Sequence, residues 1–316
     1  MKKLLLLPLL AVLALVLVVV WVYFNVQPVS TNPDFKNFLI TKGSSASQIG
    51  AKLESAGIIK SALVFKIYLQ FTGKAGSIQT GEFRLTPSFS LFRVVDQLFK
   101  GPTEVWVTIP EGLRREEIAA RFVSVLERDS NFNAEFLKMS RGQEGMLFPD
   151  TYLFSKDASA SAIVNKMLKT FVAKTADIKT TGDPTFEQKI ILASILERET
   201  KTEAERPVVS GILMNRLNAG MPLQVDASVQ YAIGTPKNWW PILSRDDLKI
   251  DSDYNTYKFS GLPPGPISNP GASSLEAAFN PARTDFWYYI HDKEGQIHYA
   301  KTLTEHNANV VKYLGD

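Results

Sequence analysis

The chain has 316 residues, enough for about two domains, and its 45% hydrophobic and 21% charged residues are typical of a globular protein rather than a disordered one. A net charge of +3, without a run of five or more Lys or Arg, argues against a nucleic-acid partner. The absence of cysteine excludes disulfides, thiolate nucleophiles and cysteine-based metal sites. The three histidines lack the spacing of an HExxH zinc site, so we expect no metal and no other cofactor.

The amino terminus begins with Lys2 and Lys3, and an uncharged run follows from Leu4 to Phe24. As a helix, this run would span roughly 30 Å, about the thickness of one bilayer core. A cleaved signal peptide is the competing interpretation, but its apolar region is normally about 7–15 residues, and this run ends in the aromatic sequence WVYFN. We therefore expect a single transmembrane anchor over residues 1–24 in the cell (inner) membrane. The amino terminus would be cytoplasmic and the remainder extracytoplasmic, because Lys2 and Lys3 favour the inner side.

Residues 25–35 are polar, contain two prolines and predict a short linker. The segment 36–103 follows, and its hydrophobic pattern predicts a strand, two helices, a strand and a further helix. Its helices begin at serines and end at glycines, which are common capping residues. This unit is small enough to be a binding module.

The remaining residues, 104–316, predict a mixed domain, so the fold class we expect for the chain is α+β. An alternating strand, TEVWVTIPEG, opens the domain, and a turn-rich aromatic segment, EGMLFPDTYLF, lies further along. Residues 221–285 hold eight prolines and predict loops, with a hairpin and a final helix after them. Earlier helices are expected at about 114–127, 132–140, 159–175, 185–200 and 203–219.

The helix over residues 185–200 contains LASILERET, in which Glu197 and Glu199 interrupt an apolar run. Each residue of a helix advances about 100°, so the two glutamates lie on different faces. Glu199 falls within the apolar stripe and Glu197 falls on the far side, where solvent or a structural pairing is expected. The stripe consists of Ile191, Leu192, Ile195 and Leu196.

A carboxyl group among Ile and Leu side chains is desolvated, which raises its pKa. A carboxylic acid that stays neutral near pH 7 suits a general acid, for example one that protonates a glycosidic oxygen. The alternative is a helix-end glutamate that pairs with Arg206 or Arg216, and spacing alone does not separate the two hypotheses.

The sequence LQVDASVQY places Gln224, Asp226 and Ser228 at a period of two, so an extended chain would direct all three into one cleft. Such side chains bind sugar hydroxyls and amides, although an exposed strand edge would have the same pattern. Asp226 and Asp150 are the candidates for a second carboxylate. His306 is a further candidate that could hydrogen-bond into the site, although a surface histidine is the simpler interpretation.

Two neighbouring segments, DYNTY and SGLPPGPISNPG, form a loop region rich in Gly, Pro and Asn. The prolines, including Pro263 and Pro264, would stiffen one wall of the site. The aromatic residues nearby would offer apolar faces for sugar rings, although isolated aromatics more often serve packing. Candidate substrate-binding residues from these segments are Tyr254, Asn255 and Asn269, and the other aromatics are Trp239, Trp240 and Tyr257.

Several of these motifs, in order, resemble the YceG-like family of endolytic murein transglycosylases. They are GMLFPDTYLF, LASILERET, MPLQVDASVQYAIG, YNTYKFSGLPPGPISNPG and EHN, and the resemblance covers about residues 36–316. It implies a LysM-like module at 36–103 and a YceG-like catalytic domain at 104–316. Ser228 departs from the threonine that the family often has, but it keeps the hydroxyl.

The resemblance implies cleavage between N-acetylmuramic acid and N-acetylglucosamine in nascent peptidoglycan strands, which would terminate glycan elongation. The substrate's own 6-hydroxyl would attack and leave a 1,6-anhydro end, with Glu199 as the catalytic acid and base. Peptidoglycan synthases are possible partners. The alternatives are a muramidase-type hydrolase, which would use a second carboxylate, and a non-catalytic peptidoglycan-binding scaffold.

Overall fold

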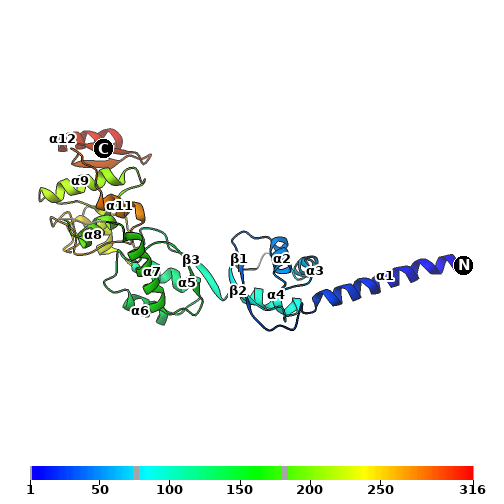
Figure 1. Cartoon of the computed structure of the whole chain (residues 1–316). Helices are drawn as coiled ribbons and strands as arrows, with labels where there is room; N and C mark the ends of the chain where they lie inside the picture. The colour runs from blue at the N-terminus through cyan, green and yellow to red at the C-terminus, as the bar shows by residue number, and fades with distance from the viewer. Residues whose placement is uncertain (1, 74–77, 179–183, 316) are drawn as a thin grey trace. The chain divides into compact units, whose positions relative to one another are not determined.

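The computed structural model describes residues 2–73, 78–178 and 184–315, and within these ranges it describes side chains from residue 12 onward. The fold is mixed α+β, as predicted. The chain divides into two compact units (Figure 1). Unit 1 comprises Met1–Val107 with Leu153–Asp157, and unit 2 comprises Thr108–Tyr152 with Ala158–Asp316.

Unit 1 contains the strand, helix, helix, strand and helix that the sequence predicts after residue 36. Side chains of Ser45, Ser61 and Ser90 cap its three inner helices by accepting a backbone N–H three residues on. The strands form one sheet in the order β1-β2-β3-β4, and β1 pairs antiparallel with β2. The elements are α1 (Lys2–Val26), β1 (Lys36–Ile40), α2 (Ala46–Ser55), α3 (Ala62–Phe71), β2 (Gly81–Leu85) and α4 (Leu91–Lys100), with most of β3 (Glu104–Thr108) and β4 (Thr151–Ser155), whose remaining residues are counted in unit 2.

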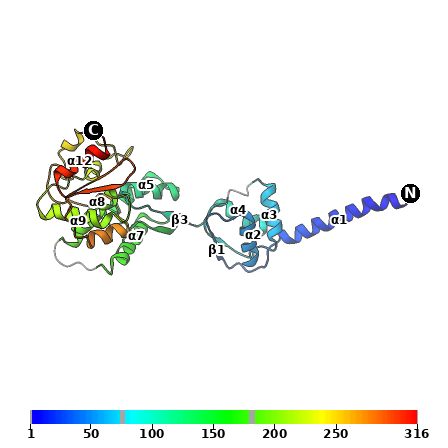
Figure 2. The ribbon, with the colours of Figure 1, turned by 90° about the horizontal axis from the view of Figure 1, so that it is seen from above.

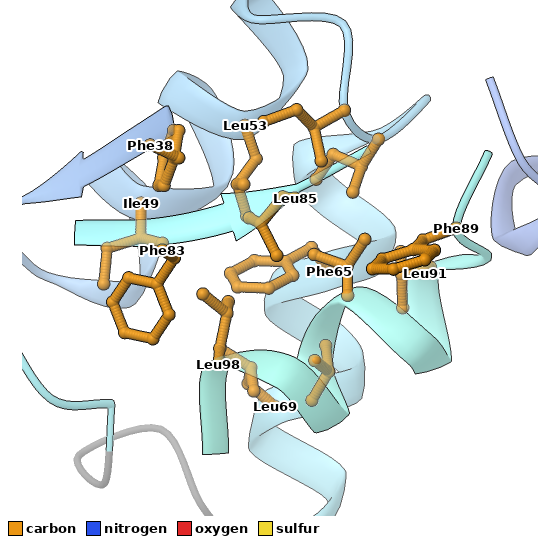
Figure 3. Packing of buried hydrophobic residues seen from close by; sticks show 14 of the residues in the cluster. Phe38, Ile49, Leu53, Phe65, Leu69, Phe83, Leu85, Phe89, Leu91 and Leu98 are labelled. Atoms are coloured by element: carbon orange, nitrogen blue, oxygen red, sulfur yellow. The ribbon is translucent and has the colours of Figure 1, made fainter. Parts of the chain in front are cut away.

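The core of unit 1 lies between the β1–β2 pair and the three inner helices (Figure 3). Alternation in the strands turns Phe38 and Phe83, paired in register, toward this core. Phe65 and Leu69 of α3 and Leu98 of α4 meet them and are fully buried. Each such side chain contributes about 1.5–3 kcal/mol when it leaves water, so this small unit has a core of its own.

Within the part of the chain that the structure describes in full, no helix is both long and apolar enough to cross a membrane. The predicted span at 4–24 includes residues 4–11, whose side chains lie outside that description.

Unit 2 contains most of the helices (Figure 1), and α9 lies between α8 and the carboxyl-terminal hairpin with its helix. The predicted helix at 185–200 is present as α8, and Thr185 and Gln188 form a capping box at its start. The predicted hairpin is also confirmed, with Tyr289 opposite Tyr299. The elements are α5 (Arg115–Val125), α6 (Ser130–Met139), α7 (Ala160–Thr175), α8 (Phe186–Glu199), α9 (Arg206–Asn218), α10 (Asp226–Ile233), η1 (Asp247–Lys249), α11 (Ala272–Phe279), β5 (Tyr288–His291), β6 (Ile297–Ala300) and α12 (Leu303–Tyr313).

Loops dominate residues 221–285, as predicted, but the segment also contains α10, the short helix η1 and α11, which were not predicted. The extended conformation expected for LQVDASVQY is wrong from Asp226 onward, where α10 begins. Buried Val225 and Val229 fit a period of two and also lie one helical turn apart, so the pattern was ambiguous. Asp226 in the first turn favours the helix through its interaction with the helix dipole.

Candidate functional site

A cavity of about 420 Å³ opens in unit 2 at the carboxyl-terminal end of α8. Glu199 is the last residue of that helix and lines the cavity. The residues around it come from α9, the start of α10, the hairpin and α12. They are Arg216, Leu223, Gln224, Asp226, Tyr257, Tyr288, Tyr289, Ile290, His291, Leu303, His306 and Leu314.

The Glu199 carboxyl group is held from two sides. The hydroxyl of Tyr289 donates a hydrogen bond to Oε2 at 2.9 Å. The backbone N–H of Ala227, in the first turn of α10, donates a longer one to Oε1 at 3.4 Å. Among the described residues, Glu199 forms no ion pair, so the predicted alternative of pairing with Arg206 or Arg216 is not observed. The side chain is partly exposed because it opens on the cavity.

The surroundings of Glu199 favour its neutral form. Burial among protein groups raises the pKa of Glu199, and the negative charge of Asp226 raises it further. The hydrogen bonds from Tyr289 and Ala227 oppose this rise, since they stabilise the carboxylate. Burial also raises the pKa of Tyr289 far above its ordinary value, so its hydroxyl stays protonated and donates. The site therefore holds a carboxyl group that can both give and accept a proton.

Helix α9 fixes the hairpin that carries Tyr289. A Cβ on Gly211 would come within 2.1 Å of the Ala282 carbonyl oxygen, so the glycine permits the close approach of helix and loop. One turn further, the Asn215 side chain donates to the carbonyls of Thr284 and Phe286, at 2.9 and 3.1 Å. Arg216 then donates to the Trp287 carbonyl at 2.8 Å. These contacts lead directly into β5 and set the position of Tyr289 relative to α8.

The start of α10 is held by the loop that contains Thr256. The Thr256 hydroxyl accepts the N–H of Val225 at 2.9 Å and shares a hydrogen bond with the Ser228 hydroxyl, also at 2.9 Å. The next residue in this loop, Tyr257, donates to Asp226 at 2.5 Å. These bonds direct the first turn of α10, with Ala227 and Asp226, toward Glu199.

Glu197 is also largely enclosed, with 7% of its side chain exposed, but its contacts differ from those of Glu199. Its carboxylate pairs with Arg206 at 3.2 Å and accepts the N–H of Gly271 at 3.0 Å. Glu197 thereby joins α8 to α9 and to the end of the proline-rich loop. Ser194 binds the same loop through Ile267 and Ser268, each at 3.0 Å.

Five of the residues that the sequence predicted at or near the site line the cavity together: Glu199, Gln224, Asp226, Tyr257 and His306. Gln224 is exposed there and has a φ of 54°, in the left-handed region that favours glycine. Because α10 replaces the expected strand, Asp226 and Ser228 do not point the same way. Ser228 is fully buried and bound to Val225 and Thr256.

The remaining marked residues lie outside the cavity lining. Asn255 and Asn269 are fully buried, and their amides bind backbone groups of the surrounding loops. The Tyr254 ring packs against Tyr231 at a tilt of 40°, with ring centroids 4.9 Å apart. Pro263 lines a different cavity, beside α9. Pro264 and Asp150 are exposed, and Trp239 and Trp240 pack around Arg114.

The sequence did not single out Tyr289, Tyr288, His291 or Arg216 as site residues. Tyr289 is 90 positions from Glu199, and its hairpin was predicted only as a hairpin. A tyrosine in a partly buried strand needs a hydrogen-bond partner for its hydroxyl, and this need was the one feature of the sequence that could have pointed to Tyr289. No group of three His, Asp or Glu side chains able to hold a metal occurs in the part of the chain that the structure describes.

Comparison with known proteins gives consistent matches. The YceG-like family model matches residues 38–312. The chain is 34% identical to a Bacillus subtilis protein named endolytic murein transglycosylase, over 88% of this chain and 84% of that protein. A Streptococcus pneumoniae protein of the same name is 29% identical, over 87% of this chain and 58% of its own length.

Among solved structures, a crystal structure of a yceG-like protein from Listeria monocytogenes is similar, with a TM-score of 0.55 and 32% identity. The similarity covers 88% of this chain and 99% of that one. With the family model matching nearly the whole length after the amino-terminal helix, the chain belongs to the YceG-like family.

Proposed function

We propose that this protein is an endolytic murein transglycosylase, a lyase that cuts peptidoglycan glycan strands internally. The relatives of that name and the family membership support the proposal. The observation that carries it is Glu199, a carboxyl group with a raised pKa that opens on a cavity large enough for part of a sugar chain.

In the proposed reaction, protonated Glu199 donates its proton to the oxygen between N-acetylmuramic acid and N-acetylglucosamine. The C1–O bond of the muramic acid breaks, and positive charge develops at C1. The 6-hydroxyl of the same sugar attacks C1 while the Glu199 carboxylate accepts its proton. The products are a 1,6-anhydro end and a free hydroxyl on the leaving strand, and no water is consumed.

The neighbouring residues have distinct parts in this proposal. Tyr289 orients the carboxyl group and stabilises it once it has given up its proton. Asp226 disfavours the ionised form before the reaction, through its charge. Gln224 and Asp226 are exposed at the cavity and are placed to bind sugar hydroxyl or amide groups.

A hydrolase is the second candidate, because Asp226 shares the cavity with Glu199. Mass spectrometry of products from uncrosslinked glycan separates the two reactions, since an anhydro end is lighter by one water than a reducing end. We expect anhydro ends with the unaltered protein and no products with Glu199→Gln. Reducing ends as the main product would overturn the proposal.

We also propose that residues 4–24 anchor the protein in the cell membrane, with both units on the outer side where peptidoglycan lies. The uncharged run within α1, with lysines before it and aromatic residues at its end, supports this. We further propose that residues 36–103 are a LysM-like glycan-binding module. The order β1-α2-α3-β2, with the two strands antiparallel, supports that proposal.

A further inference from the structure

Helix α3 of unit 1 presents an apolar stripe to its surroundings. Leu63, Ile67 and Phe71 recur every four residues and are 56%, 41% and 90% exposed. Phe92 of α4 extends the stripe and is 48% exposed, and its ring packs against Tyr68 with centroids 5.0 Å apart. We call these four residues, Leu63, Ile67, Phe71 and Phe92, the apolar stripe.

The stripe is not needed for the core of unit 1. The opposite side of α3 supplies Phe65 and Leu69, which are fully buried. A helix at the surface of a water-soluble domain normally turns polar residues outward, and contiguous exposed apolar side chains mark a contact surface. Phe71 is nearly as exposed as an isolated side chain, so little of the described part of unit 1 covers this end of the stripe.

Helices α3 and α4, which carry the stripe, lie beside the carboxyl-terminal end of α1 (Figure 1, Figure 2). Trp21, Val22 and Val26 of α1 line a cavity of about 180 Å³ together with residues of α3 and α4. The residues on the module side are Val64, Ile67, Tyr68, Phe71 and Phe92. Lys60 also reaches this end of α1, where it donates to the Phe24 carbonyl at 3.4 Å.

If α1 is the proposed anchor, the contacts between its carboxyl-terminal end and α3 set the depth of the apolar stripe relative to the membrane. Trp21 lies within the last turn of the apolar run, where aromatic residues mark the boundary between hydrocarbon and headgroups. Side chains that line one small cavity with Trp21 lie at nearly the same depth. The headgroup layer extends about 5–8 Å beyond the hydrocarbon core on each side, enough to contain the stripe.

We propose that the apolar stripe is a membrane-contact surface, and that its partner is the interfacial layer of the lipid bilayer. This inference rests on the proposed anchor. Leu63, Ile67, Phe71 and Phe92 enter this layer, as the apolar face of an interfacial helix does. Lys60 and Lys66 are exposed on and beside α3 and are placed to meet anionic headgroups. Residues 36–103 are then held against the membrane by α3 as well as by the chain that links them to α1.

The absence of cysteine allows a direct test with single labelled sites in the full-length protein. Phe71→Cys carries an environment-sensitive fluorophore at the stripe. Leu39→Cys is the matched control, since Leu39 is an exposed apolar residue of β1 in the same unit. Val16→Cys reports on the proposed anchor. Each protein is reconstituted into vesicles of phosphatidylethanolamine and phosphatidylglycerol, with or without a lipid that carries a nitroxide quencher near its headgroup.

We expect the nitroxide lipid to quench the label at position 71 several-fold more than the label at position 39. Equal quenching at 71 and 39, with the label at 16 in the membrane, would overturn the membrane contact and leave the anchor standing. The stripe would then be a surface for another protein. If the label at 16 is not in the membrane, the anchor fails as well. The cleavage assay is independent, so failure of the proposed enzyme activity remains distinguishable.

Discussion

Two carboxyl groups of unit 2, Glu199 and Glu144, both have pKa values raised mainly by burial, yet their surroundings differ. Burial and the nearby charge of Glu116 raise the pKa of Glu144 to about 8. Its oxygens accept hydrogen bonds from the Arg115 backbone at 3.1 Å and from Asn269 at 2.6 Å, and only 9% of the residue is exposed. Glu199 has fewer donors and opens on the cavity. A raised pKa therefore does not identify a catalytic acid unless a substrate can also reach it.

Substitution of Glu199 and substitution of Glu144 should differ most in their effect on the rate of glycan cleavage. Glu199→Gln should lower the rate of glycan cleavage by about 10²–10⁴-fold, the usual contribution of general acid–base catalysis, and leave the protein folded. Glu144→Gln should keep most of the activity, because Glu144 lies outside the cavity lining. Release of fragments from uncrosslinked glycan measures both. A comparable loss of cleavage rate in the two variants would contradict the assignment of Glu199, and not Glu144, as the catalytic acid.

Glu197 provides a second comparison, on the same helix as Glu199. Glu197→Gln should lower the free energy of unfolding by roughly 2 kcal/mol, because it removes one charge of an enclosed pair with Arg206. Glu199→Gln should lower the free energy of unfolding by less, since Glu199 has no ion pair to lose. Denaturant unfolding monitored by circular dichroism measures both values. A larger loss for Glu199→Gln would mean that its role is structural.

The titration of Glu144 should be visible in the pH dependence of stability. Its folded-state pKa of about 8 lies above the ordinary 4.5, so the stability it contributes is fully present below about pH 4.5 and declines as pH rises toward 8. Between pH 4.5 and about 8, the free energy of unfolding should fall less steeply with pH in Glu144→Gln than in the unaltered protein. The difference in slope should be up to about 1.4 kcal/mol per pH unit. Identical pH slopes for the two proteins would show that Glu144 does not titrate in this way.

The smallest expected effects concern the groups that adjust Glu199. Tyr289→Phe removes a hydrogen bond that lowers the pKa of Glu199, so the alkaline limb of the pH–rate profile should move to higher pH. Asp226→Asn removes a charge that raises this pKa, so the limb should move to lower pH. The rate of Tyr289→Phe at neutral pH should also fall by about tenfold, the value of one charge-assisted hydrogen bond. Shifts in the same direction would contradict the assigned electrostatics.

The sequence predicted the elements whose patterns are local. Helix α8 was recognisable from its apolar stripe and cap, and the hairpin from two alternating segments around a turn. Helix α10 was missed because it is short, and because Val225 and Val229, four positions apart, fit both a strand and a helix. Helix α11 was missed although its Ala, Leu and Glu residues favour a helix, since the prolines before it directed attention to loops.

The site was predictable only in part. Helical phase distinguishes Glu199 from Glu197, because that distinction depends on one helix. The bond from Tyr289 to Glu199 and the pairing of Glu197 with Arg206 depend on how α8, α9 and the hairpin pack together, and no local pattern encodes that packing. For the same reason, the polarity of Asn255 and Asn269 suggested ligand contacts, whereas both amides satisfy buried backbone groups.

In the proposed mechanism, the substrate's own 6-hydroxyl, and not water, attacks the anomeric carbon after Glu199 protonates the leaving oxygen. Cleavage of uncrosslinked glycan in water enriched in ¹⁸O, followed by mass spectrometry of the new ends, tests this most directly. We predict 1,6-anhydro ends without ¹⁸O from the unaltered protein and no new ends from Glu199→Gln. New reducing ends that carry ¹⁸O would contradict the claim, because they would show that water is the nucleophile.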